Sequence, residues 1–145
     1  MRVSEIMTRD VRVAGPRESI QRAAAIMASI DAGAVPVADK DRLVGMLTDR
    51  DIAVRAVAKG KGPETPVGDI MTADVCYCFD DEEIDHVLDN LGDQQIRRLP
   101  VVDRDKRLVG ILSLGDLANR GDISHTGAAL AEISRPGGQH SQTRM

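Results

Sequence analysis

The stretch Ser4–Val11 reads Ser-Glu-Ile-Met-Thr-Arg-Asp-Val, and 64 positions later Gly68–Val75 reads Gly-Asp-Ile-Met-Thr-Ala-Asp-Val. Three further pairs of segments match at this offset, or at 65 after one inserted residue: Ile20 with Ile84, Val35–Val37 with Leu99–Val101, and Gly45–Asp51 with Gly110–Asp116. A match that holds at a fixed offset over this length marks an internal repeat. The sequence therefore predicts one small folding unit that occurs twice.

Each copy is predicted to begin with a strand followed by an amphipathic helix. The strands are expected at residues 11–13 and 75–79, because a Gly-Pro turn follows the first and an acidic run follows the second. Each helix carries apolar residues at i, i+3, i+4 and i+7: Ile20, Ala23, Ala24 and Met27, then Ile84, Val87, Leu88 and Leu91. Ser19 and Asp80 are the expected N-caps, with Glu83 completing a capping box in the second copy.

Two strands and a closing helix complete each copy. The strands are expected at residues 34–38 and 43–48, joined by a polar turn, and the second copy repeats this pattern around residues 103–106. Closing helices are expected after Thr48 and after Ser113. We predict an α+β fold of two pseudo-symmetric β-α-β-β-α repeats, over residues 1–62 and 63–122, which pack sheet to sheet. Residues 123–145 are expected to form a flexible C-terminal tail.

The composition excludes several classes of protein. The 145 residues are 42% hydrophobic but only 1% aromatic, and the formal net charge is −4. A nucleic-acid-binding protein needs a basic face or aromatic stacking platforms, and this chain offers neither. No apolar run reaches membrane-spanning length. Cys76 and Cys78 are too close in sequence to link distant parts of a fold. We expect a cytoplasmic protein with no nucleic-acid or membrane partner.

The end of the last strand in each copy carries the most informative motif. Both copies read Gly, two apolar residues, Thr or Ser, two more residues and Asp, which places Thr48 with Asp51 and Ser113 with Asp116. A strand that brings a hydroxyl to the start of a helix ends where unpaired backbone N–H groups and the helix dipole both favour phosphate. A carboxylate one turn on can accept hydrogen bonds from ribose hydroxyls. The same spacing is also an ordinary capping device. Its occurrence at matching positions of both copies favours a ligand role.

These residues resemble those of a tandem pair of cystathionine-β-synthase (CBS) domains, also called a Bateman module. The resemblance covers about Val3 to Gly121 and rests on the two Ile-Met-Thr segments, the two Pro-containing strands and the two Gly-to-Asp motifs. It implies clefts between the copies that hold adenosyl ligands such as AMP, ATP, NAD(H) or S-adenosylmethionine, although some family members bind no known ligand. It also implies the site residues: Thr48 and Asp51 with Val11 or Val13 and Val35 in one cleft, and Ser113 and Asp116 with Val75 and Leu99 in the other.

Phosphate groups require cations, and four arginines lie beside the motifs or the Pro-containing strands: Arg50, Arg55, Arg97 and Arg98. Each is equally compatible with a solvated surface arginine. The first motif contains Asp49-Arg50, whereas the second contains the uncharged Leu114-Gly115. We therefore expect unequal sites, with the first better equipped for a charged phosphate.

The predicted function is that of a stand-alone regulatory module rather than an enzyme. No nucleophile elbow, Walker loop or His-Glu-x-x-His pattern is present. Cys76 and Cys78 point to one face of a strand, where core packing is favoured over a metal site. The resemblance implies a homodimer, and an unidentified effector protein is the expected recipient of the signal. The alternative is a ligand-independent interaction or scaffold module in which the paired motifs only cap helices.

Overall fold

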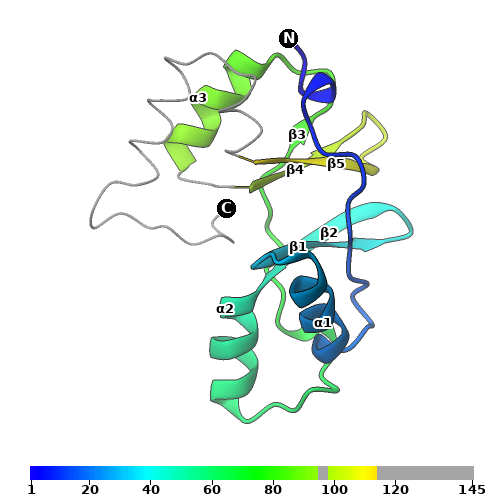
Figure 1. Ribbon diagram of the computed structural model, residues 1–145, viewed down its shortest axis with the longest axis vertical. Coiled ribbons are helices and arrows are strands. Elements are labelled where there is room, and N and C mark those ends of the chain that lie inside the picture. Colours follow the sequence, from blue (N-terminus) through cyan, green and yellow to red (C-terminus); the bar gives the residue numbers. More distant parts are fainter. Residues whose placement is uncertain (95–97, 114–145) are drawn as a thin grey trace. The chain divides into compact units, whose positions relative to one another are not determined.

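The structure, a computed structural model, describes residues 1–94 and 98–113 of the chain. These residues fall into two compact units (Figure 1). The inner unit is Arg12–Val75, and the outer unit combines Met1–Val11 with the chain from Cys76 onward. Both mix helices with strands, so the α+β class predicted from the sequence is confirmed. None of the helices in the described residues is long and apolar enough to cross a bilayer.

The inner unit contains a helix, a hairpin and a second helical segment (Figure 1). Its elements in chain order are α1 (Ile20–Ile30), β1 (Ala34–Asp39), β2 (Arg42–Thr48), α2 (Asp49–Asp51), the π-helical η2 (Ile52–Ala56), and the 3₁₀ turns η3 (Val57–Lys59) and η4 (Val67–Asp69). The strand predicted at residues 11–13 does not form, and Ala14 makes only an isolated parallel bridge to Val37. This segment contains the boundary between the two units, at Val11 and Arg12.

Helix α1 begins where the sequence predicts. The Ser19 side chain accepts a hydrogen bond from the backbone N–H of Arg22 at 3.2 Å, which satisfies one of the free donors of the first turn. Ile20, Ala23 and Met27 are buried as predicted, but Ile26 is the fourth buried residue and Ala24 is exposed. The apolar stripe is therefore rotated slightly from the predicted one, and it leaves Ala24 on the open side of the helix.

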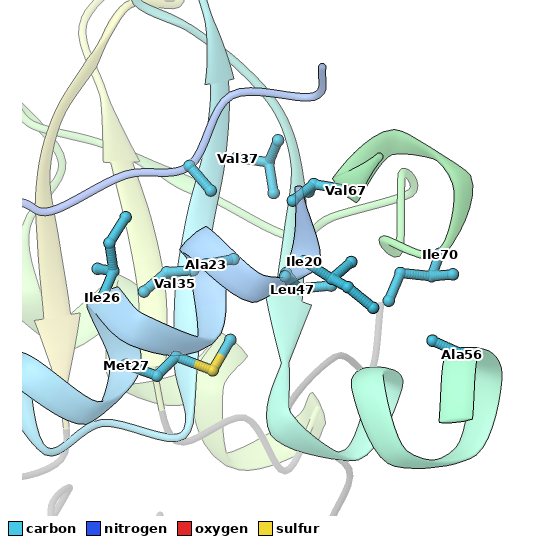
Figure 2. Packing of buried hydrophobic residues seen from close by; sticks show 11 residues of the cluster. Ile20, Ala23, Ile26, Met27, Val35, Val37, Leu47, Ala56, Val67 and Ile70 are labelled. Carbon is cyan, nitrogen blue, oxygen red and sulfur yellow. The ribbon is translucent and has the colours of Figure 1, made fainter. Parts of the chain in front are cut away.

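The hairpin β1–β2 supplies the other wall of the inner core. The strands pair antiparallel with Val35 opposite Leu47, and the turn places Lys40 and Asp41 at φ values of 53° and 68°. Two consecutive positive φ values match the right-handed twist of a tight hairpin. Figure 2 shows the result, in which side chains from α1, both strands, η2 and η4 converge. The core is built from aliphatic side chains, as the scarcity of aromatic residues requires.

The Ile-Met-Thr segment of each copy completes the sheet of the other copy. In the inner unit, Thr72 exchanges two backbone hydrogen bonds of 2.9 Å with Met46 on β2. In the outer unit, Thr8 exchanges two of 2.9 Å with Ile111 on β5. Each segment belongs by sequence to one copy but packs with the hairpin of the other. The compact units are therefore not the repeats as they follow one another along the chain, and the limits 1–62, 63–122 and 123–145 remain a prediction.

The outer unit repeats the plan of the inner one. Its elements are η1 (Val3–Glu5), β3 (Cys78–Phe79), α3 (Ile84–Gln94), β4 (Arg98–Val102) and β5 (Leu108–Ser113), with sheet order β3-β4-β5. Its core contains Val3, Ile6 and Met7 from the N-terminal segment together with side chains of α3 and the sheet. The second closing helix and the C-terminal tail predicted from the sequence lie outside the described residues.

The predicted N-cap of α3 is wrong, because the helix begins at Ile84 rather than directly after Asp80. Residues 80–83 form a turn in which the carboxylate of Glu82 accepts the backbone N–H of Phe79 at 2.9 Å. Glu18 accepts the N–H of Gly15 at 2.6 Å in the inner unit, 64 positions earlier. A turn closed by a glutamate side chain thus precedes the first helix of both copies. In the second copy this turn uses Glu82, a residue of the acidic run in which the sequence predicts a capping box.

We expect Gly45→Ala to lower the free energy of unfolding by about 1 to 3 kcal/mol, because overpacking costs this much when the neighbour cannot move freely. A Cβ at Gly45 would lie 2.7 Å from the Thr72 carbonyl oxygen and 2.8 Å from Met71 Sδ. Gly62→Ala is the control, since its nearest atoms belong to the side chain of Glu64, and it should change stability by about 0.5 kcal/mol or less. Urea denaturation measures both, and equal effects would contradict a required close approach at Gly45.

Candidate functional site

Thr48 and Asp51 form a reciprocal pair at the end of β2. The Thr48 hydroxyl accepts the backbone N–H of Asp51 at 3.0 Å, and Oδ2 of Asp51 accepts the backbone N–H of Thr48 at 3.0 Å. Both residues are buried, with exposed fractions of 2% and 6%. The strand ends and the helix starts at this pair because it satisfies donors that neither element can satisfy alone. The capping role that the spacing predicts is therefore present in the structure.

The Asp51 carboxylate is held at an electrostatic cost. Burial raises its pKa, while the hydrogen bonds from Thr48 and the nearby guanidinium of Arg55 act in the opposite direction. Arg55 lies 3.8 Å from Oδ1 of Asp51 and also donates to the Met71 carbonyl at 3.3 Å. A cap needs only an oxygen acceptor, which asparagine or serine would supply without a charge. The positive end of the helix dipole also favours a carboxylate in the first turn, so the charge of Asp51 is compatible with capping as well as with ligand binding.

Both oxygens of the Asp51 carboxylate have a partner in the inner unit. Oδ2 accepts the N–H of Thr48, Oδ1 lies 3.8 Å from Arg55, and Asp51 is only 6% exposed. Arg50 follows Thr48 by two residues and is exposed on α2. A carboxylate oxygen can accept hydrogen bonds from sugar hydroxyls, and a guanidinium can attract phosphate.

The other residues predicted for the first site do not all share one unit. Val35 is fully buried in the inner core (Figure 2), opposite Leu47 and one residue from the Ala34–Thr48 pair. Val13 belongs to the inner unit and is 37% exposed. Val11 is half-buried and belongs to the outer unit. The inner unit by itself thus brings Thr48, Asp51 and Arg50 together beside β1.

The residues predicted for the second site are described only in part. Ser113 is half-buried at the end of β5, Arg98 is exposed at the start of β4, and Leu99 is a core residue with 5% exposure. Val75 is half-buried and is the last residue of the inner unit. Asp116 and Arg97 lie outside the described residues. The second hydroxyl and carboxylate pair is therefore a prediction from the repeat.

Sequence reasoning missed the link between Arg55 and the Ile-Met-Thr segment. The sequence leaves Arg55 open between a phosphate contact and a solvated surface arginine, whereas its guanidinium contacts both the Asp51 carboxylate and the Met71 carbonyl. It reaches them from η2, a π-helical turn that is wider than an α-helical one. No periodicity in the sequence distinguishes that turn from an α-helix, so the pattern gave no signal for this contact.

Cys76 and Cys78 contribute to the outer core. Cys78 is buried in it, and Cys76 is half-buried against it. Burial, aided by the charges of Glu82 and Asp80, raises the pKa of the Cys78 thiol to about 12, so this sulfur stays protonated at neutral pH. Among residues 1–94 and 98–113, no three His, Cys, Asp or Glu side chains converge in a way that suits a metal ion.

Comparison with known proteins identifies relatives over nearly the whole chain. The CBS domain profile matches residues 3–57 and 67–121. The CBS domain-containing protein YhcV of Bacillus subtilis is 41% identical over 133 residues, which cover 91% of this chain and 94% of YhcV.

Two solved structures extend this comparison. The CBS domain pair of MJ0100, solved with 5′-methylthioadenosine and S-adenosyl-L-methionine, superimposes with a TM-score of 0.70 at 32% identity, covering 82% of this chain and 94% of that one. CBSX2, solved with AMP, gives a TM-score of 0.72 at 28% identity, with coverages of 81% and 93%.

We expect Asp51→Asn to reveal the cost of the buried carboxylate. A carboxyl whose pKa is raised in the folded state binds its proton more tightly when folded, so its contribution to the free energy of unfolding falls as the pH rises from the ordinary value of 3.8 through the raised one. Asparagine keeps an acceptor for the Thr48 N–H but does not titrate. The stability of the natural protein minus that of the variant should therefore decrease between about pH 4 and neutrality. Denaturation at several pH values measures this difference, and a value independent of pH would contradict the assignment.

Proposed function

This chain belongs to the CBS domain family, and we propose that it is a regulatory module that binds an adenosyl ligand at Thr48 and Asp51. The observation that carries the proposal is the buried carboxylate of Asp51 at the end of β2, whose charged form burial disfavours although a neutral acceptor would also serve the cap. Charged groups kept in costly positions are characteristic of functional sites. The ligands solved with MJ0100 and CBSX2 share an adenosine group, which supports the same class of ligand for this chain.

In the proposed complex, Oδ1 of Asp51 accepts hydrogen bonds from the ribose 2′ and 3′ hydroxyls. Arg50 carries the positive charge that a 5′ phosphate requires, and Val13 with Val35, both of the inner unit, are assigned to the adenine side. AMP, ATP, NAD(H) and S-adenosylmethionine all satisfy the ribose requirement. The presence of Arg50 favours the phosphorylated members of this set, because a guanidinium binds two phosphate oxygens together.

A second, weaker site is proposed around Ser113 and Asp116, with Leu99 and Arg98. It has the hydroxyl and carboxylate of the first motif but lacks the counterpart of Arg50, which is Gly115. We expect this site to accept an adenosyl group with less dependence on phosphate. The two sites are therefore proposed to differ in affinity, which would let one chain respond over a wide range of ligand concentrations.

The signal is proposed to pass through assembly and through an effector protein rather than through catalysis. Ligand binding shifts an equilibrium only when two states bind the ligand unequally. The homodimer is proposed to form through the helices of the inner unit, on which Ile30, Val54 and Val57 are exposed by 39%, 44% and 66%.

One observation favours the alternative of a ligand-independent scaffold. Thr48 and Asp51 already satisfy each other, so the motif is complete as a cap without a ligand. The two functions differ in their response to nucleotides. A ligand at about 100 times its dissociation constant stabilises the folded state by about 2.7 kcal/mol, whereas a scaffold shows no such gain with any adenosyl compound.

We expect Asp51→Ala to weaken AMP binding by about 10-fold to 150-fold, since a charge-assisted hydrogen bond contributes about 1.5 to 3 kcal/mol. Calorimetry should show a smaller loss for Asp51→Asn, which keeps the cap. Asp41→Asn, an exposed carboxylate in the hairpin turn, is the control and should bind as the natural protein does.

The analogue 2′,3′-dideoxy-AMP separates ligand contact from structural damage. It lacks the hydroxyls assigned to Asp51, so the natural protein and Asp51→Asn should bind it equally. An equal loss for AMP and for the dideoxy analogue would show that Asp51 acts only through the fold.

We expect Val57→Asp to shift the chain from dimer to monomer, because it places a charge in the apolar surface of the inner-unit helices. Light scattering after size-exclusion chromatography gives the mass directly. Tyr77→Ser is the control, since Tyr77 is 40% exposed but lies in the outer unit. A monomeric natural protein would exclude signalling by this assembly.

A further inference from the structure

Arg55 connects two parts of the inner unit through one atom. Its Nη1 lies 3.8 Å from Oδ1 of Asp51 and donates to the Met71 carbonyl at 3.3 Å. Asp51 lies in the first turn of the helical segment after β2, whereas Met71 belongs to the Ile-Met-Thr segment that pairs with β2. One guanidinium nitrogen therefore contacts both the proposed ribose acceptor and the segment exchanged between the copies.

The charge of the Asp51 carboxylate depends on this arginine. Burial raises the pKa of Asp51, and the hydrogen bonds from Thr48 and the guanidinium of Arg55 oppose that shift. A ribose hydroxyl donates its proton, so the ionised carboxylate is the acceptor that it needs. Displacement of the guanidinium would therefore weaken the acceptor to which the ligand is proposed to bind.

The exchanged segment fixes where the guanidinium lies. The Arg55 side chain is 50% exposed. An exposed arginine has many accessible rotamers, and a hydrogen bond to a fixed acceptor selects one of them. The Met71 carbonyl is such an acceptor, because Thr72 exchanges two backbone hydrogen bonds with Met46 and Ile70 lies in the inner core (Figure 2). The position of Arg55 at Asp51 thus depends on the pairing of the segment with β2.

The sequence repeats these residue types in the second copy. The aspartate and the arginine recur at the offset of 65, and the methionine recurs at the offset of 64: Asp51 with Asp116, Arg55 with Arg120, and Met71 with Met7. Arg50 has no such counterpart, because Gly115 occupies its position. An arginine four residues after the aspartate is therefore common to both motifs, whereas the arginine beside the hydroxyl is not.

We propose that Arg55 is the positioning residue through which the adenosyl site and the segment Ile70–Thr72 regulate each other, an inference that rests on the proposed function. The paired segment holds Arg55 at Asp51 and so favours the ligand, and the bound ligand in turn stabilises the pairing. Such coupling is reciprocal, so pairing raises the ligand affinity by the factor by which the ligand stabilises pairing. An arginine that only supported the fold would not link these two events.

Hydrogen exchange of the full chain, followed by amide NMR signals, measures how firmly the segment is held, because an amide exchanges only when its hydrogen bond opens. Thr72 and Met46 donate the two hydrogen bonds of the pairing, and Ala14 and Ala38 donate those of the corresponding bridge to β1. Saturating AMP should slow exchange at Thr72 and Met46 by about two- to fivefold more than at Ala14 and Ala38, the factor expected for one partly exposed ion pair.

Arg55→Met removes the guanidinium and keeps an apolar side chain. It should abolish the selective slowing at Thr72 and Met46 and weaken AMP binding by about two- to fivefold. Arg22→Met is the matched control, since the Arg22 side chain is also exposed and forms an i,i+4 ion pair with Glu18 in the same unit. This variant should leave both the AMP affinity and the selective slowing unchanged.

A double-mutant cycle tests the link in the other direction. Gly45→Ala places a Cβ 2.7 Å from the Thr72 carbonyl oxygen and so weakens the pairing. It should lower the AMP affinity of the natural protein by about two- to fivefold but change that of Arg55→Met little, because the link is then already broken. Gly62→Ala should leave the AMP affinity unchanged in both backgrounds.

The outcomes separate this inference from the proposed function. Absence of AMP binding to the natural protein in calorimetry would overturn the proposed function and this inference with it. If AMP binds, equal slowing at the two bridges, or a selective slowing that persists in Arg55→Met, would overturn only the role of Arg55. Additive effects of Gly45→Ala and Arg55→Met on the AMP affinity would do the same.

Discussion

The crossing of each Ile-Met-Thr segment over a glycine of the opposite hairpin is the contact on which the rest of the structure depends. Thr72 and Thr8 each add two backbone hydrogen bonds to a strand that began in the other copy. The two segments can approach the strands this closely only because Gly45 and Gly110 have no Cβ. A Cβ at Gly110 would lie 2.5 Å from Met7 Sδ. The exchange means that neither half of the sequence contains a complete sheet. Stability of one copy therefore requires the presence of the other.

This exchange also positions the candidate site. Gly45, where Thr72 crosses, is three residues before Thr48, so the strand that receives the foreign segment is the one that ends at the capping pair. Arg55 then connects the Asp51 carboxylate to the Met71 carbonyl of the same foreign segment. A change in the charge around Asp51 would act directly on this contact. One guanidinium therefore links the proposed binding residue to the packing of the exchanged segment.

Most of the fold was predictable because the signals are local or repeated. The Ser19 cap, the hairpin at residues 34–48 and the duplication itself follow from short patterns. The exchange of segments between copies was not predictable, since an offset shows that two segments are alike and not which partner each one contacts. The sequence predicts Thr48 and Asp51 as one motif, and the structure shows that they cap the helix that follows β2. The burial of Asp51 and the reach of Arg55 depend on backbone geometry that the sequence pattern does not encode.

A duplicated chain separates the residues that make the fold from those that specialise one copy. Gly45 and Gly110, the paired threonines, and the acceptors Glu18 and Glu82 occur in both copies and serve structure. Other positions differ between the copies throughout the repeat, and two of them lie inside the capping motif, where Asp49 and Arg50 correspond to Leu114 and Gly115. The shared residues therefore keep the fold in both copies, while the charge beside the motif is free to differ. This difference in charge is the physical basis for proposing two unequal sites.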